Sequence, residues 1–112
     1  MDISLLVQEL SAQENPGLDT FDARFDEIVT EIEKADYQAA AQKVEDIMKE
    51  GVYDIRLLGY FAYGYFIENG PARLSELLSG LVYVLQESFE HFGPVKNKEK
   101  QAQSSLKWFF GQ

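Results

Sequence analysis

One segment, from Ile55 to Asn69, constrains the fold most because it is apolar nearly all the way round. Its apolar and aromatic residues are Ile55, Leu57, Leu58, Tyr60, Phe61, Ala62, Tyr63, Tyr65, Phe66 and Ile67. A helix without a polar face is usually packed by neighbours on several sides. Asp54 is suited to cap its start, and Asn69-Gly70 to end it. We therefore expect this helix at the centre of the fold.

Apolar residues also recur at helical spacing before this segment, and three helices are expected there. The first carries Ile3, Leu6, Val7 and Leu10 and ends before Asn15-Pro16-Gly17. The second begins after a cap at Asp19 or Thr20, with a buried stripe of Phe21, Phe25, Ile28, Val29 and Ile32. The third begins after Asp36, ends at Gly51, and carries Tyr37, Ala40, Ala41, Val44, Ile47 and Met48 inward.

Two more helices are expected after the central one. The fifth opens at Pro71, a preferred first helical position, and ends at Gly93-Pro94. Its inward residues are Leu74, Leu77, Leu78, Leu81, Val82, Leu85 and Phe89. A basic, polar stretch then leads to a short last helix with Leu106, Trp108, Phe109 and Phe110.

These patterns predict an all-α fold, a compact antiparallel bundle of about six helices that forms one domain over residues 1–112. No segment alternates apolar and polar residues as a strand does, and short connections favour antiparallel neighbours. The longest uncharged run, residues 57–67, is too short to cross a bilayer, so no membrane insertion is expected. An acidic N-terminus unlike a signal peptide and the absence of cysteine fit a cytoplasmic protein.

The charge is strongly acidic and unevenly spread. The net charge is −9, and residues 1–50 hold 13 Asp or Glu against 4 Lys or Arg. Such a surface repels phosphate, so ordinary nucleic-acid binding is not expected. The simplest interpretation is a solvated helix surface; the alternatives are a face for a basic partner and a mimic of DNA.

No motif predicts catalysis, a cofactor or a metal. The sole histidine, His91, lacks a second histidine or carboxylate cluster at suitable spacing and is expected to complement a helix C-terminus. Asp22 and Asp26 share a helix face, but solvated carboxylates are the expected interpretation. Gly59 and Gly64 follow no strand, so they are expected to let neighbouring helices approach closely rather than to cradle phosphate.

The aromatic residues are the best candidates for a binding site. Too many crowd the central helix for all of them to face inward in so small a domain. Exposed tyrosine and tryptophan commonly anchor protein interfaces. The candidate interface residues are Tyr60, Tyr63, Tyr65 and Trp108.

Several motifs, in order along most of the chain, resemble the ImpA-type N-terminal domain of TssA-like proteins of the bacterial type VI secretion system. They are Asn15-Pro16-Gly17-Leu18-Asp19, Phe21-Asp22 with Phe25, Asp36-Tyr37, Tyr53-Asp54-Ile55-Arg56-Leu57, Gly70-Pro71-Ala72-Arg73-Leu74, Phe89-Glu90-His91-Phe92-Gly93-Pro94 and Leu106-Lys107-Trp108-Phe109. The chain departs from the pattern at Tyr37, where the family often has tryptophan. It also departs at Phe92-Gly93, which interrupts the more usual His-Pro pair, and at Gln101 or Gln103, which replaces an expected arginine.

The resemblance implies a non-enzymatic structural role. Proteins of this family act in the cytoplasm in assembling the baseplate and the tail tube and sheath, and they oligomerise through a separate C-terminal region. By this interpretation the chain is either an N-terminal fragment of a longer protein or a shortened relative. It is expected to bind other baseplate and tail components, and its main oligomerisation is expected through the missing C-terminal region. A free-standing helical adaptor and an acidic DNA-mimic regulator remain as alternatives.

Overall fold

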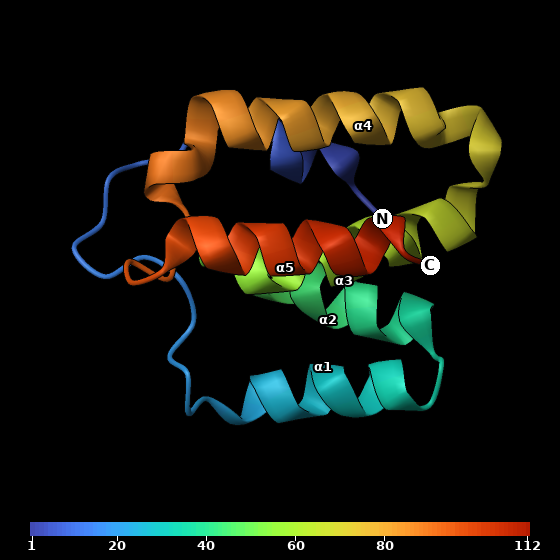
Figure 1. Ribbon diagram of the computed structural model, residues 1–112, viewed down its shortest axis with the longest axis horizontal. Helices are drawn as coiled ribbons and strands as arrows, with labels where there is room; N and C mark the ends of the chain where they lie inside the picture. The colour runs from blue at the N-terminus through green and yellow to red at the C-terminus, as the bar shows by residue number, and fades with distance from the viewer.

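Helix α3 (Ile55–Asn69) runs through the middle of the computed structural model, which describes residues 1–112 (Figure 1). It packs most extensively against α2 (Tyr37–Lys49) and α5 (Lys98–Phe110), while α1 (Ala23–Glu33) covers the outer side of α2. Its buried residues cover most of the circumference of the helix: Ile55, Leu57, Leu58, Gly59, Phe61, Ala62, Gly64 and Tyr65. The predicted central position of this segment is therefore confirmed.

Two glycines let the neighbouring helices cross α3 closely. A Cβ atom added at Gly64 would overlap the Cβ of Ala41 and lie 2.6 Å from the carbonyl oxygen of Tyr37 in α2. A Cβ at Gly59 would overlap the carbonyl oxygen of Ser105 in α5. The Gly59 amide also donates a hydrogen bond of 2.8 Å to the Ser105 hydroxyl. The interpretation of both glycines as helix-crossing positions is confirmed.

The predicted start of the second helix is wrong by a few residues. Helix α1 begins at Ala23, and its cap is Asp22, whose side chain accepts from the Arg24 amide. Asp19 instead accepts from the Phe21 amide in the preceding turn. Phe21 consequently lies outside the helix and is 95% exposed, not part of a buried stripe. The predicted caps Asp36 and Asp54 are confirmed, since each side chain accepts a hydrogen bond from a backbone amide in the first turn of its helix.

The predicted first helix is reduced to one 3-10 turn, η1 (Ile3–Leu6). This turn packs on α4 and α2 and buries the adjacent pair Leu5 and Leu6, whereas Val7 is 46% exposed. A single turn suffices to bury two consecutive leucines. An α-helical stripe would instead have turned Val7 inward.

The predicted fifth helix divides into four pieces: η2 (Pro71–Arg73), α4 (Leu74–Tyr83), a π-helical turn η3 (Val84–Ser88) and the 3-10 turn η4 (Phe89–His91). Its buried side is formed by Leu77, Gly80, Leu81, Val84 and Ser88. Val82 and Leu85 were expected inside, yet they are 48% and 40% exposed, because they lie on a second apolar stripe of the helix.

The last helix is longer than expected. Helix α5 begins at Lys98 and includes the polar stretch that the sequence placed before it, since only one face of the helix needs apolar residues. The fold class is confirmed as all-α with five α-helices and no strand, only an isolated bridge between Asp54 and Gly93. No helix combines the length and the hydropathy required to cross a membrane.

Candidate functional site

A buried ion pair at the start of α3 fixes the loop of residues 15–20. The Asp54 side chain is fully buried, and its Oδ2 accepts a hydrogen bond of 2.9 Å from the Leu18 amide. The Arg56 guanidinium donates to Asp54 through Nε and Nη2, at 2.9 and 2.8 Å, and to the Leu18 carbonyl at 2.8 Å. This bidentate pairing fixes the arginine as well as the loop.

The same region joins the loop to the segment before α5. Gly17 has φ +98°, and a Cβ there would lie 2.8 Å from Asp54 Oδ2 and 2.8 Å from Gly93 Cα, so only glycine fits. The Gly93 carbonyl accepts from the Ile55 amide at 2.7 Å, and the Gly93 amide donates to the Tyr53 carbonyl at 2.9 Å. Three segments far apart in the sequence therefore meet at the N-terminal end of α3.

An aromatic cluster lies along α3 where α5 crosses it. The Trp108 ring makes edge-to-face contacts with Tyr60, at a centroid distance of 4.9 Å, and with Tyr63, at 5.7 Å. Tyr37 from α2 packs against Tyr63 at 4.8 Å. Edge-to-face geometry is a preferred arrangement of aromatic pairs. All four rings are partly exposed, so the cluster is both packed and accessible.

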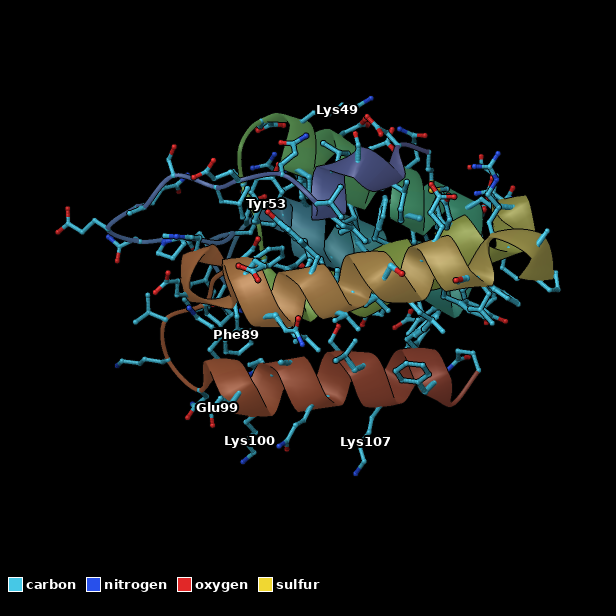
Figure 2. All side chains as sticks on the ribbon, turned by 90° about the horizontal axis from the view of Figure 1, so that it is seen from above. Lys49, Tyr53, Phe89, Glu99, Lys100 and Lys107 are labelled. Atoms are coloured by element: carbon cyan, nitrogen blue, oxygen red, sulfur yellow. The ribbon has the colours of Figure 1, made fainter.

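Beside this cluster, a hollow of about 430 Å³ opens between α1, α3 and α5. We call it the aromatic groove, and it is lined by Thr20, Phe25, Val29, Arg56, Tyr60, Gln101, Ser104, Ser105 and Trp108. Aromatic side chains line it together with uncharged polar groups from α5. The lysines of α5 do not line it, and Figure 2 shows Lys100 and Lys107 pointing away from the body of the molecule.

The electrostatics of the groove are close to neutral. Arg56 is its one charged lining residue, and the guanidinium is already paired with Asp54 and stacked on the Phe25 ring at 4.4 Å. Burial raises the pKa of the Tyr60 hydroxyl, so this group is neutral at physiological pH. The Ser105 hydroxyl accepts from Gly59, and no histidine or carboxylate lines the groove to activate a serine. Such a surface suits an apolar or aromatic side chain with neutral hydrogen-bonding groups.

The structure brings three of the four predicted interface residues together. Tyr60 and Trp108 line the aromatic groove, and Tyr63, which does not line it, contacts the Trp108 ring. Tyr65 is different, because it is 2% exposed and packs near Phe61 in the core. Its predicted position at the surface is therefore wrong. Tyr65 lies on the opposite side of α3, where its ring is buried in the core.

Sequence reasoning missed the other walls of the groove. Phe25 and Val29 were expected in the buried stripe of α1, but Val29 is 36% exposed and both residues line the hollow. Gln101 lies in the polar stretch that was not expected to be helical, and Ser104 follows that stretch in α5. The proximity of Asp54 and Arg56 in the sequence was the one available signal for the adjoining ion pair.

The other residues considered as chemical groups, Asp22 and His91, interact with residues close to them in the sequence. Asp22 accepts hydrogen bonds from the side chain and the backbone of Arg24, and these bonds lower the pKa of its carboxyl. His91 Nε2 lies 3.5 Å from the Glu90 carboxylate. No group of three or more histidine or carboxylate side chains is arranged to hold a metal ion.

Comparisons of the chain with protein-family models, with curated proteins and with solved structures find no match.

Proposed function

We propose that this chain is a non-enzymatic adaptor domain that binds a partner protein through the aromatic groove. One observation carries the proposal: Trp108 and Tyr60 present their rings in a hollow whose one charged residue, Arg56, is paired with Asp54, on a strongly acidic chain. Partly exposed tyrosine and tryptophan in a pocket are the side chains most often responsible for binding energy in protein interfaces. The rings are held by α3 and α5, so little conformational entropy is lost on binding.

The proposed setting is the assembly of the type VI secretion baseplate and tail tube and sheath in the bacterial cytoplasm. This part of the proposal rests on the motif resemblance. The motif segments around Leu18, Ile55 and Gly93 hydrogen-bond to one another at the start of α3. Motif segments that are far apart in the sequence therefore form one local structure beside the groove. The proposed partners are other baseplate and tail components, with self-association through a further region.

The acidic DNA-mimic alternative is less well supported. Several carboxylates in or beside α1 and α2 are already paired within the chain. Asp22 and Glu50 both bind Arg24, and Glu45 lies 3.2 Å from Lys49. A mimic of DNA would need rows of unpaired charge, and these ion pairs neutralise part of it. The aromatic groove is equally unsuited to nucleic acid, since its one cation is already neutralised.

The proposal is tested by filling the groove without disturbing the core. Ser104 is exposed and lines the groove, whereas its neighbour Gln103 is exposed outside it. Ser104→Arg places a long cation in the hollow, and Gln103→Arg is the matched control with the same change on the same helix. Each variant would be immobilised and exposed to purified type VI baseplate and tail components.

The expected result is that the wild-type chain and Gln103→Arg retain one of these components and Ser104→Arg loses it, with equal melting temperatures for all three. Retention of none of them by the folded wild-type chain would refute the type VI setting. Equal retention by all three would refute the groove as the binding site.

A further inference from the structure

Two unpaired lysines border the aromatic groove along α5. Lys100 and Lys107 lie four residues before and three residues after Ser104, which lines the groove, and residues at this spacing are neighbours on a helix surface. Both lysines are exposed and form no ion pair within the chain. Figure 2 shows them projecting from the same side of α5. We call this pair the basic rim of the groove.

Two unpaired carboxylates border the groove along α1. Asp26 and Glu33 lie three residues before and four residues after Val29, which lines the groove from that helix. Both are exposed, and neither forms an ion pair. We call this pair the acidic rim. Glu27 is exposed too, but it lies on another face of α1, because residues two positions apart do not share a helix face.

The two rims match in length and direction. In each, the two charges are seven residues apart, which corresponds to two helical turns or about 10 Å. Helices α1 and α5 run in the same direction in Figure 1, and both supply walls of the groove, so the two rims follow its two edges. The groove is therefore neutral inside and carries opposite charge along its two edges.

The backbone chemistry of the groove selects a helix as its occupant. The lining residues come mainly from α1, α3 and α5, whose backbone groups hydrogen-bond within the helices. An extended segment over the aromatic rings would lose the hydration of its backbone and find no sheet edge to pair with, because the fold has no strand. A helix satisfies its own backbone and presents apolar side chains at i, i+3, i+4 and i+7 over two turns.

The rims select the charges of that helix. An acidic edge is attracted by the basic rim, and a basic edge by the acidic rim, whereas a helix with two edges of one sign is repelled at one side. A second copy of the chain does not supply such a helix at its exposed apolar residues Val82 and Leu85, because residues 74–88 contain no lysine or arginine. The charge pattern therefore favours a different protein as the partner.

We propose that the aromatic groove binds one amphipathic helix of a partner protein, with an acidic edge against Lys100 and Lys107 and a basic edge against Asp26 and Glu33. The inference rests on the proposed function and names the kind of partner that the groove takes. The rims also set the direction of binding. Turning a helix end for end exchanges its two edges, so a given partner helix fits in one direction only.

The test uses three helical peptides of about 18 residues without tryptophan, each with leucines at i, i+3, i+4 and i+7. The two-sign peptide has glutamates along one edge of the leucine stripe and lysines along the other. The acidic peptide has glutamates along both edges, and the basic peptide has lysines along both. Binding is followed by the emission of Trp108, the only tryptophan of the chain, which lines the groove. Binding elsewhere on the molecule is thus not counted.

The expected result on the wild-type chain is a saturable shift of the Trp108 emission to shorter wavelength. The two-sign peptide should bind roughly three- to tenfold more tightly than either of the others, because it gains exposed ion pairs at both rims. Attraction to the net charge of −9 would instead favour the basic peptide. A preference for the two-sign peptide is therefore specific to the rims.

Reversal of the acidic rim tests the same inference from the side of the chain. Asp26→Lys combined with Glu33→Lys makes both rims basic and should move the preference to the acidic peptide. Glu9→Lys combined with Glu27→Lys is the matched control, with the same change of charge at two exposed glutamates that do not border the groove, and it should keep the preference for the two-sign peptide. Melting temperatures show whether each variant is folded. If the rim variant does not fold, the order of affinities on the wild-type chain decides alone.

Equal affinities of the three peptides, each with an emission shift, would overturn the role of the rims and leave the groove as a binding site. A preference for the basic peptide that both double variants weaken alike would assign binding to net charge and overturn the inference. No emission shift with any peptide would overturn the helical occupant. The retention assay with Ser104→Arg tests the proposed function separately, so the two failures are distinguishable.

Discussion

The crossing of α2 over α3 at Gly64 makes a quantitative prediction. In Gly64→Ala, the new methyl group meets the Cβ of Ala41 and lies 2.6 Å from the Tyr37 carbonyl oxygen. A backbone carbonyl cannot rotate away as a side chain can, so the helices must separate. Overpacking of this kind costs about 1–3 kcal/mol. The higher helix propensity of alanine offsets about 1 kcal/mol of this cost.

The net loss of stability is thus up to roughly 2 kcal/mol, which for a chain of this size lowers the melting temperature by up to about 9 °C. The matched control is Gly80→Ala in α4. There the nearest atom to the new methyl is Leu6 Cδ1, at 3.2 Å, which belongs to the end of a side chain and not to the backbone. This variant should melt at the same temperature as the wild-type chain or slightly above it. Thermal denaturation followed by circular dichroism measures both, and a Gly64→Ala variant as stable as Gly80→Ala would refute the close crossing.

Three further predictions concern the ion pairs and one exposed ring. Asp54→Ala should cost about 3 kcal/mol in urea denaturation, because it leaves the Arg56 charge uncompensated, and hydrogen exchange at the Leu18 amide should accelerate. Burial raises the pKa of Glu45, but hydrogen bonds from the Asp2 amide, a lysine and a glutamine outweigh it and bring the pKa below its ordinary 4.5. The carboxylate therefore stabilises the fold above pH 4.5, and the stability gap to Glu45→Gln should close as the pH falls below that value. Phe21→Ser, at a ring 95% exposed, should change the unfolding free energy by less than about 0.5 kcal/mol.

The central helix, its caps and its glycines were predictable because each rests on local chemistry. An all-apolar helix has few places in a fold other than the centre. Asp36 and Asp54 each stand alone as a cap before an apolar run. The start of α1 was not predictable in this way, because Asp19, Thr20 and Asp22 are all good caps. The Arg24 amide and side chain select Asp22.

The candidate sites depend on tertiary arrangement, which the sequence does not encode locally. The aromatic groove forms from three helices, so Val29 could be assigned to the core as readily as to a wall. Helix α4 offers two apolar stripes, and the packing of η1 decides which one is covered. Val82 was consequently placed inside, and Tyr65 outside, from periodicity and crowding alone.

The binding role of the aromatic groove is tested most directly by the fluorescence of Trp108, the only tryptophan in the chain. Its ring lines the groove and is partly exposed, so a partner that occupies the groove must remove water from it. The proposal predicts that titration with the retained baseplate or tail component shifts the Trp108 emission to shorter wavelength and saturates, and that Ser104→Arg abolishes the shift. The titration would use a tryptophan-free variant of the component. Binding with an unchanged emission spectrum would contradict the assignment of this groove as the interface.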